Sequence, residues 1–350
     1  MSIERIEIAP GFSISRIIKG GWQLSQGHSE GNKDHAIEDM FSFVDQGITT
    51  FDCADIYTGV EELIGKFLKE RKRRFGSISD VQVLTKFVPD FDVLSRITKS
   101  HVEKVIDRSL KRLGVEQLDM VQFSWWSYSV PKWMETAHWL KELQHAGKIN
   151  LISGTNFNTQ ATRAMVESGV PITTLQVQYS LLDNRPEKEL IALCKEKNIH
   201  LLCYGTVAGC FLSERWLGVA EPMPPYENRS MVKYKLMILE FGGWELFQSL
   251  LRTLSQIANS HQVSLTNVAT RYIIERNQVG GVIIGARDSK HVDENLKLFD
   301  FQLRQKDYEA IENIISQRQG PVGDVFDIER IKDGQHGSIM RYNLNQIIEA

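Results

Sequence analysis

Short apolar runs alternate along the chain with longer segments in which apolar residues recur every three or four positions. The short runs are typical of buried strands, and the longer segments are typical of amphipathic helices. We predict strands at residues 16–20, 49–53, 81–87, 118–124, 150–154, 173–178, 200–204 and 281–285. Helical segments follow them, and a clear one places Val102, Val105 and Ile106 on one face and stops at Gly114.

Eight strand-and-helix units in 350 residues predict a parallel sheet closed into a (β/α)8 TIM barrel. An open, doubly wound sheet is the alternative. An open sheet that bound a dinucleotide would normally carry G-x-G-x-x-G after its first strand, and the sequence has no such run. The closed barrel is therefore the preferred fold.

Three segments lie outside the repeat. Residues 1–15 contain Pro10-Gly11 between two alternating runs, which predicts an N-terminal β-hairpin that plugs the bottom of the barrel. Residues 213–243 are too long for a plain connection and form a candidate lid. The C-terminal tail is expected to fold back over one face. The chain shows no linker, so we expect a single domain over residues 1–350, with a core of about 16–317 and a tail of 318–350.

Composition narrows the classes of function. The chain is 42% hydrophobic and 24% charged with a net charge of -3, which excludes a disordered or collagen-like protein and makes nucleic acid an unexpected partner. It has neither an apolar run of membrane-spanning length nor the features of a signal peptide, so we expect a cytoplasmic protein without a membrane partner. Four cysteines without a C-x-x-C pair, and histidines without ligand spacing, predict neither a disulfide framework nor a metal site.

The chemistry-bearing side chains stand where the predicted strands end. In a barrel of this kind the reactive groups lie at the carboxyl ends of the strands, and Asp52, Tyr57 and Lys86 all fall there. An ammonium beside a phenol favours the phenolate and lowers its pKa, and a carboxylate keeps that ammonium protonated. We therefore interpret these three residues as a proton-donating relay. The alternative is a purely structural role, in which Asp52 and Lys86 form an ion pair and Tyr57 is a packed aromatic residue.

The segment 51–57 reads F-D-C-A-D-I-Y and is followed by Glu61 and Gly65. It resembles the F-D-T-A-x-x-Y-x-x-x-E-x-x-x-G signature of the aldo-keto reductases. Further motifs that resemble those of the family occur in the same order along the chain, at residues 109–119, 147–157, 175–179, 204–209 and 284–295. The resemblance spans roughly Gly20 to Asn295.

The resemblance implies an oxidoreductase that uses NADPH to reduce a small aldehyde or ketone on a TIM barrel, with Tyr57 as the general acid. The residues it assigns to the cofactor are Trp22, Thr155, Asn156, Gln176, Tyr204, Gly205, Val207, Gly209, Gly285, Arg287, His291 and Asn295. Among these, Thr155, Asn156 and Gln176 would hold the nicotinamide carboxamide, and Tyr204 would stack on its ring. A guanidinium suits a 2′-phosphate, so Arg287 favours NADPH, with NADH as the alternative.

One departure from the family concerns its fourth active-site residue. The family carries a His at the end of strand four, where this chain has Ser124. A hydroxyl can orient a carbonyl but cannot relay a proton near pH 7 as imidazole does. Two functions therefore stay open: slow or redirected carbonyl reduction, and a nicotinamide-binding regulatory or scaffold protein with weak or lost catalysis. Trp22, Trp125 and Trp126 are expected to wall the substrate pocket, and the oligomeric state is left open.

Overall fold

The computed structural model describes residues 3–25, 35–285, 288–290 and 292–345. Eight parallel strands close into a barrel in the order β10-β3-β4-β5-β6-β7-β8-β9. The strands are β3 (Ile17–Gly20), β4 (Thr50–Asp52), β5 (Gln82–Phe87), β6 (Leu118–Phe123), β7 (Ile149–Thr155), β8 (Ile172–Gln178), β9 (His200–Tyr204) and β10 (Val279–Gly285). The predicted (β/α)8 barrel is confirmed, and each predicted strand matches an observed one within two residues at either end.

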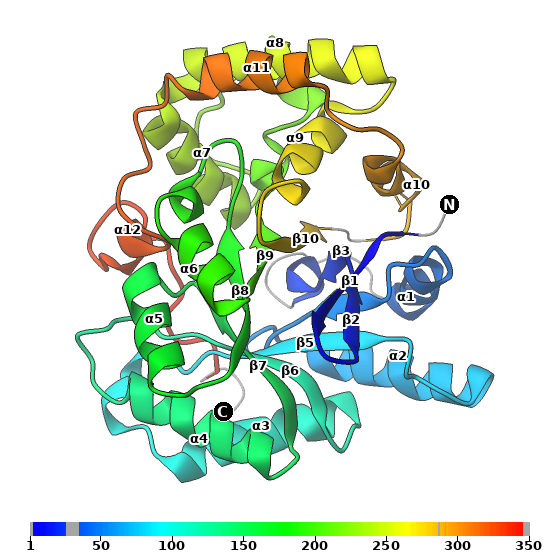
Figure 1. The fold of residues 1–350 in the computed structure, drawn as a ribbon, viewed down its shortest axis with the longest axis vertical. Helices are drawn as coiled ribbons and strands as arrows, with labels where there is room; N and C mark the ends of the chain where they lie inside the picture. The colour runs from blue at the N-terminus through cyan, green and yellow to red at the C-terminus, as the bar shows by residue number, and fades with distance from the viewer. Residues whose placement is uncertain (1–2, 26–34, 286–287, 291, 346–350) are drawn as a thin grey trace.

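An antiparallel hairpin closes the amino-terminal end of the barrel. Its strands are β1 (Arg5–Ala9) and β2 (Phe12–Ser15), drawn in dark blue in Figure 1. Ile8 and Ile14 from the hairpin form one buried cluster with inward-facing side chains of the barrel, namely Ile18, Leu84, Met120 and Leu202. The predicted plug is therefore present, and it fills the barrel with apolar side chains at the end opposite the strands' carboxyl termini.

Helices surround the strands as an outer layer (Figure 1). They are α1 (Ala36–Asp45), α2 (Val60–Phe75), α3 (Lys99–Leu113), α4 (Trp133–His145), α5 (Thr159–Glu167), α6 (Leu190–Lys197), α7 (Arg229–Phe241), α8 (Gly243–His261), α9 (Leu265–Ile274), α10 (Val292–Leu296), α11 (Gln305–Ile315) and α12 (Asp327–Arg330). Their apolar faces and the outward-facing strand residues build the main core. Cys53 belongs to this outer layer, as strand alternation predicts. None of the described helices is long and apolar enough to cross a membrane.

The C-terminal tail returns to the barrel mouth. Its helix α12 is fixed by a buried ion pair between Glu329 and Arg185, whose closest N–O distance is 2.8 Å. Residues 339–345, which we call the strap, then dock on the segment after β5, where the backbone N–H groups of Leu344 and Asn345 both donate to the Asp90 carboxylate at 2.9 Å. The tail thus folds back over one face, as expected from the sequence.

Candidate active site

A cavity of about 370 Å³ opens at the carboxyl ends of the barrel strands. Its walls come from the strand ends, the loop after β9, the first turns of α7 and the tail. The parallel register brings these strand ends to one level, with Gly20 opposite Asp52 and Lys86 opposite Gln122. Polar side chains from segments far apart in the sequence therefore meet at one opening.

A buried ion pair forms the floor of the cavity. The Lys86 ammonium donates to both Asp52 oxygens and to the carbonyl of Cys53, each at 2.7 Å. Both side chains are about 5% exposed. Burial alone would lower the pKa of Lys86, but Asp52 and the nearby Tyr57 outweigh it and raise that pKa above its usual value. Lys86 is therefore a fixed positive charge inside the protein.

Tyr57 stands beside this charge. The Lys86 nitrogen lies 5.1 Å from the centre of the Tyr57 ring, and the ring packs on Trp22 with centroids 5.0 Å apart. Burial raises the pKa of the Tyr57 phenol to about 12, and the opposing effect of Lys86 offsets only part of the rise. Lys86 acts in the expected direction and lowers this pKa, but desolvation outweighs its charge, so the net pKa lies above the usual value. At neutral pH the phenol carries its proton.

Two amide side chains connect the ion pair to the rest of the cavity. Gln176 donates to Asp52 at 2.6 Å and to the side-chain oxygen of Gln122 at 2.8 Å, and Gln122 donates to Asp52 at 2.8 Å. These bonds use both N–H groups of Gln176 and leave its oxygen as an acceptor. The Tyr204 hydroxyl donates to Asn156 Oδ1 at 2.8 Å, and no hydrogen bond between described residues uses the Asn156 Nδ2 donor. The pair Asn156 and Gln176 therefore presents one donor and one acceptor.

The loop after β9 lies directly against α7. A Cβ on Gly205 would come 2.2 Å from the Tyr234 hydroxyl, and one on Gly209 would come 2.7 Å from the Tyr234 ring. Both glycines have left-handed φ values, 78° and 60°. Only glycine fits this contact and this backbone, so the loop exposes its backbone to the cavity.

Most of the residues predicted from the sequence line the cavity. They are Trp22, Asp52, Tyr57, Lys86, Ser124, Trp126, Thr155, Asn156, Gln176, Tyr204, Gly205, Val207, Gly209 and Gly285. Asn295 lies on α10 and is not part of the lining, so its assignment to the cofactor stays a prediction. Arg287 and His291 lie outside the described residues.

Trp125 does not line the cavity, which corrects its prediction as a pocket wall. It is 1% exposed, packs on Phe123 and donates from its indole nitrogen to the carbonyls of Ser127 and Val130. Alternation explains the error, because consecutive residues in an extended segment point to opposite sides. Ser124 and Trp126 face the cavity, so Trp125 faces the helical layer.

Sequence reasoning missed several neighbours of the site. Gln122 could have been found, because it alternates with Ser124 on the same strand face. Asp55 is fully buried behind Tyr57 and accepts backbone bonds from Ile56 and Val88. Burial and then Glu61 raise its pKa to about 8. The candidate lid of residues 213–243 contains α7, whose first turns line the cavity, but the sequence did not single out which residues of α7 or of the tail reach the mouth.

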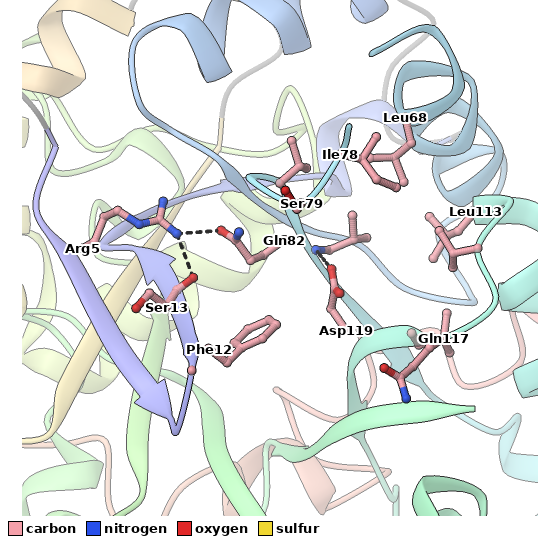
Figure 2. A pocket seen from close by; sticks show the side chains of 15 residues that line it. Arg5, Phe12, Ser13, Leu68, Ile78, Ser79, Gln82, Leu113, Gln117 and Asp119 are labelled. Atoms are coloured by element: carbon pink, nitrogen blue, oxygen red, sulfur yellow. Dashed lines mark hydrogen bonds between the residues drawn. The ribbon is translucent and has the colours of Figure 1, made fainter. Parts of the chain in front are cut away.

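A second cavity of about 420 Å³ lies at the opposite end, between the hairpin, α2 and the loop before β6. Figure 2 shows Arg5 bonded to Ser13 and Gln82. Asp119 accepts the backbone N–H of the β5 residue Val83 at 2.8 Å. These groups hold the hairpin and neighbouring strands together. Its described lining residues include Asp119 but no tyrosine or lysine, so the combination found at the mouth is not repeated there.

Comparison with known proteins agrees with this geometry. The sequence profile described as "Aldo/keto reductase family" matches residues 16–316. The chain is 27% identical over 325 residues to the aldo-keto reductase YhdN of Bacillus subtilis, covering 90% of this chain and 95% of that protein. It is 28% identical over 332 residues to the chloroplastic pyridoxal reductase of Arabidopsis thaliana, covering 89% and 87%. In fold it resembles the glycerol dehydrogenase of Gluconobacter oxydans, with a TM-score of 0.76 and 23% identity over 93% of this chain and 99% of that one.

Proposed function

The chain belongs to the aldo/keto reductase family, and from this premise we propose that it is an NADPH-dependent oxidoreductase that reduces an aldehyde or ketone to an alcohol. The proposal is supported most strongly by the residues that meet in the cavity at the barrel mouth. A protonated phenol, Tyr57, stands beside the buried Lys86 and Asp52 pair in the same cavity as the amides of Asn156 and Gln176. A proton donor and a carboxamide-binding pair in one cavity are what nicotinamide-dependent carbonyl reduction requires.

The residues present fit a nicotinamide dinucleotide. Asn156 offers a donor and Gln176 an acceptor, which complements a primary carboxamide. The Tyr204 ring lines the same wall and suits stacking on a flat heterocycle. The loop that contains Gly205 and Gly209 lines the same cavity, and a glycine-rich loop of this kind would suit a diphosphate through its backbone N–H groups.

The chain's own residues donate one proton and stabilise the charge that its transfer leaves behind. A bound reduced nicotinamide would supply the hydride. Tyr57 gives the phenolic proton to the carbonyl oxygen of the substrate as that oxygen becomes negative. Its pKa of about 12 keeps the proton in place before the reaction. Lys86, fixed by Asp52, stabilises the phenolate that remains, because two opposite charges attract more strongly where they are buried.

Ser124 takes the place of the family's histidine. It is 7% exposed and lines the cavity, so its hydroxyl can donate one hydrogen bond to a carbonyl. We infer that it orients the substrate and takes no part in proton transfer. This residue also favours the second candidate function, a nicotinamide-binding regulatory protein with lost catalysis.

The NADPH preference rests on Arg287. We expect Arg287→Ala to weaken binding of NADPH about tenfold or more while changing NADH affinity little, because only NADPH carries the 2′-phosphate that a guanidinium can grip. Fluorescence titration of both cofactors against the wild type and the variant measures this. Equal losses for the two cofactors would contradict the preference.

The test of the proposed function combines binding and turnover. Cofactor fluorescence first measures NADPH binding, and consumption of NADPH is then followed across a panel of aldehydes and ketones, with the alcohol product identified. Reduction of at least one carbonyl compound supports the enzyme. Binding without consumption across the panel supports the regulatory protein and rejects the reductase.

A further inference from the structure

Three cations line the cavity wall, and none of them forms a direct ion pair within the described part of the chain, although the charge of Glu329 acts on Lys233 from farther away. Arg229 and Lys233 come from the first turns of α7, and Arg341 comes from the strap. Among the described residues, no carboxylate lies within ion-pair distance of any of them, and the only carboxylate in the lining, Asp52, is paired with Lys86. Three like charges around one opening repel one another unless an anion lies between them.

The strap and α7 meet at this group of cations. Arg229 donates a hydrogen bond to the carbonyl of Ile339, where the strap begins. Arg341 follows two residues later and lines the same cavity. Its charge adds to the effect of burial in lowering the pKa of Arg229, as expected for neighbouring guanidinium groups.

The position of α7 indicates which anion fits. A Cβ on Gly209 would lie 3.4 Å from the Ser230 carbonyl, so the first turn of α7 lies directly on the glycine loop after β9. Arg229 precedes Ser230, and the ammonium of Lys233 lies 4.9 Å from the centre of the Tyr204 ring. The first turn of α7, with Arg229 and Lys233 beside Ser230, therefore lies against the loop that we assign to a diphosphate, and Arg341 lines the same cavity.

The strap also has a fixed far end. The Phe91 N–H donates to the Tyr342 carbonyl at 2.8 Å, and the side chain of Asn343 exchanges two hydrogen bonds with Asp92, at 2.8 and 3.2 Å. The Tyr342 ring packs on Trp126 with centroids 5.0 Å apart. The strap is thus held at α7 on one side of the mouth and after β5 on the other.

From these contacts we propose that the strap is a clasp over the bound cofactor, in which Arg341, together with Arg229, binds the cofactor's diphosphate and slows its release. The inference rests on the proposed function for the identity of the ligand. It adds a binding residue from the C-terminal tail to those assigned on the barrel. It also makes cofactor exchange depend on undocking of residues 339–345.

The decisive variant is Arg341→Gln, which removes the charge from an exposed side chain and is expected to fold like the wild type. We expect NADPH to dissociate about tenfold faster and its Kd to rise about tenfold, because a hydrogen bond to a charged group is lost. The measurement is stopped-flow displacement of NADPH followed by tryptophan fluorescence, on the full-length protein. Lys306→Gln, which removes an exposed charge on α11 away from the cavity, is the matched control and should change neither value.

A second variant tests the clasp without altering the cavity lining. Asn343→Ala removes both bonds to Asp92, and Asn343 does not line the cavity. We expect NADPH release to accelerate severalfold. Release rates within twofold of the wild type in Arg341→Gln overturn the diphosphate contact, and unchanged release in Asn343→Ala overturns the clasp.

The substrate is the other possible source of an anion. If Arg341→Gln leaves NADPH binding unchanged but selectively raises the KM for 4-carboxybenzaldehyde over benzaldehyde, the anion belongs to the substrate and the inference is wrong. Failure of the proposed function is separable from these outcomes. A wild-type protein that binds NADPH but reduces no carbonyl compound contradicts the reductase, while its release rates still decide the clasp.

Discussion

Ser124 is the residue at which the chain and its family differ most in chemistry. Its hydroxyl lines the cavity beside Trp126, whereas Trp125 points away. Ser124→His should raise kcat/KM for a simple aldehyde about tenfold, because a preorganised donor is worth roughly 2.7 to 4 kcal/mol and serine already supplies part of it.

Steady-state kinetics on the Ser124→His variant check this, together with its thermal unfolding. The larger ring risks overpacking against Trp126, at about 1 to 3 kcal/mol of stability. A variant that folds, binds NADPH and is slower than the wild type on every aldehyde would mean that Ser124 serves a different reaction.

Asp55 gives a prediction on pH. Its pKa of about 8 in the folded protein lies above the value of about 3.9 in an unfolded chain, so the folded state holds the extra proton between these pH values. Stability must then fall as pH rises through this window and become level above pH 8. In Asp55→Asn the side chain stays neutral and can still accept backbone bonds from Ile56 and Val88.

We therefore expect the unfolding free energy of Asp55→Asn, relative to the wild type, to grow by about 1.4 kcal/mol per pH unit from pH 5 to pH 8 and then stay constant. Urea unfolding of both proteins across this range measures it. A difference independent of pH would show that Asp55 is ionised throughout.

At the scale of elements, the contact between α2 and α3 depends on one glycine. A Cβ on Gly65 would lie 2.2 Å from the carbonyl oxygen of Arg112. Replacing glycine by alanine inside a helix usually stabilises a protein by about 0.5 to 1 kcal/mol. Here the added methyl meets backbone that cannot give way, so Gly65→Ala should destabilise by about 1 to 3 kcal/mol.

Denaturant unfolding decides the sign of the Gly65→Ala effect. The neighbouring Lys66 is exposed, so Lys66→Ala on the same helix is the control and should change stability by less than about 0.5 kcal/mol. Stabilisation of Gly65→Ala would mean that α2 can move away from α3 at little cost.

The strands could be predicted within two residues because short runs of apolar and β-branched residues mark them between the helical segments, and most of their residues are buried. The same pattern placed Asp52 and Lys86 at one mouth. It could not place the strap, whose residues 341–344 are irregular and are held by bonds to Asp90 and Asp92. The direction of the net change in the Tyr57 pKa could not be predicted from the sequence either, because it depends on the balance between burial and charge in the folded protein.

At the scale of the whole molecule, the apolar packing and the candidate active site lie at opposite ends of the barrel. The hairpin and the apolar cluster around Ile14 and Leu84 close one end, and the polar groups gather at the other. The tail crosses from the α7 side to the β5 side of that open end. Binding and proton transfer therefore depend on side chains that converge only when the barrel is closed.

The central claim is that Tyr57 gives the proton that completes carbonyl reduction, and Tyr57→Phe tests it most directly. The variant keeps the ring that packs on Trp22 but lacks the acid. NADPH affinity and NADPH consumption with a reactive aldehyde are measured in parallel on the wild type and the variant. The account predicts a Kd within a few-fold of the wild type and the loss of turnover. Turnover retained at the wild-type rate would contradict it.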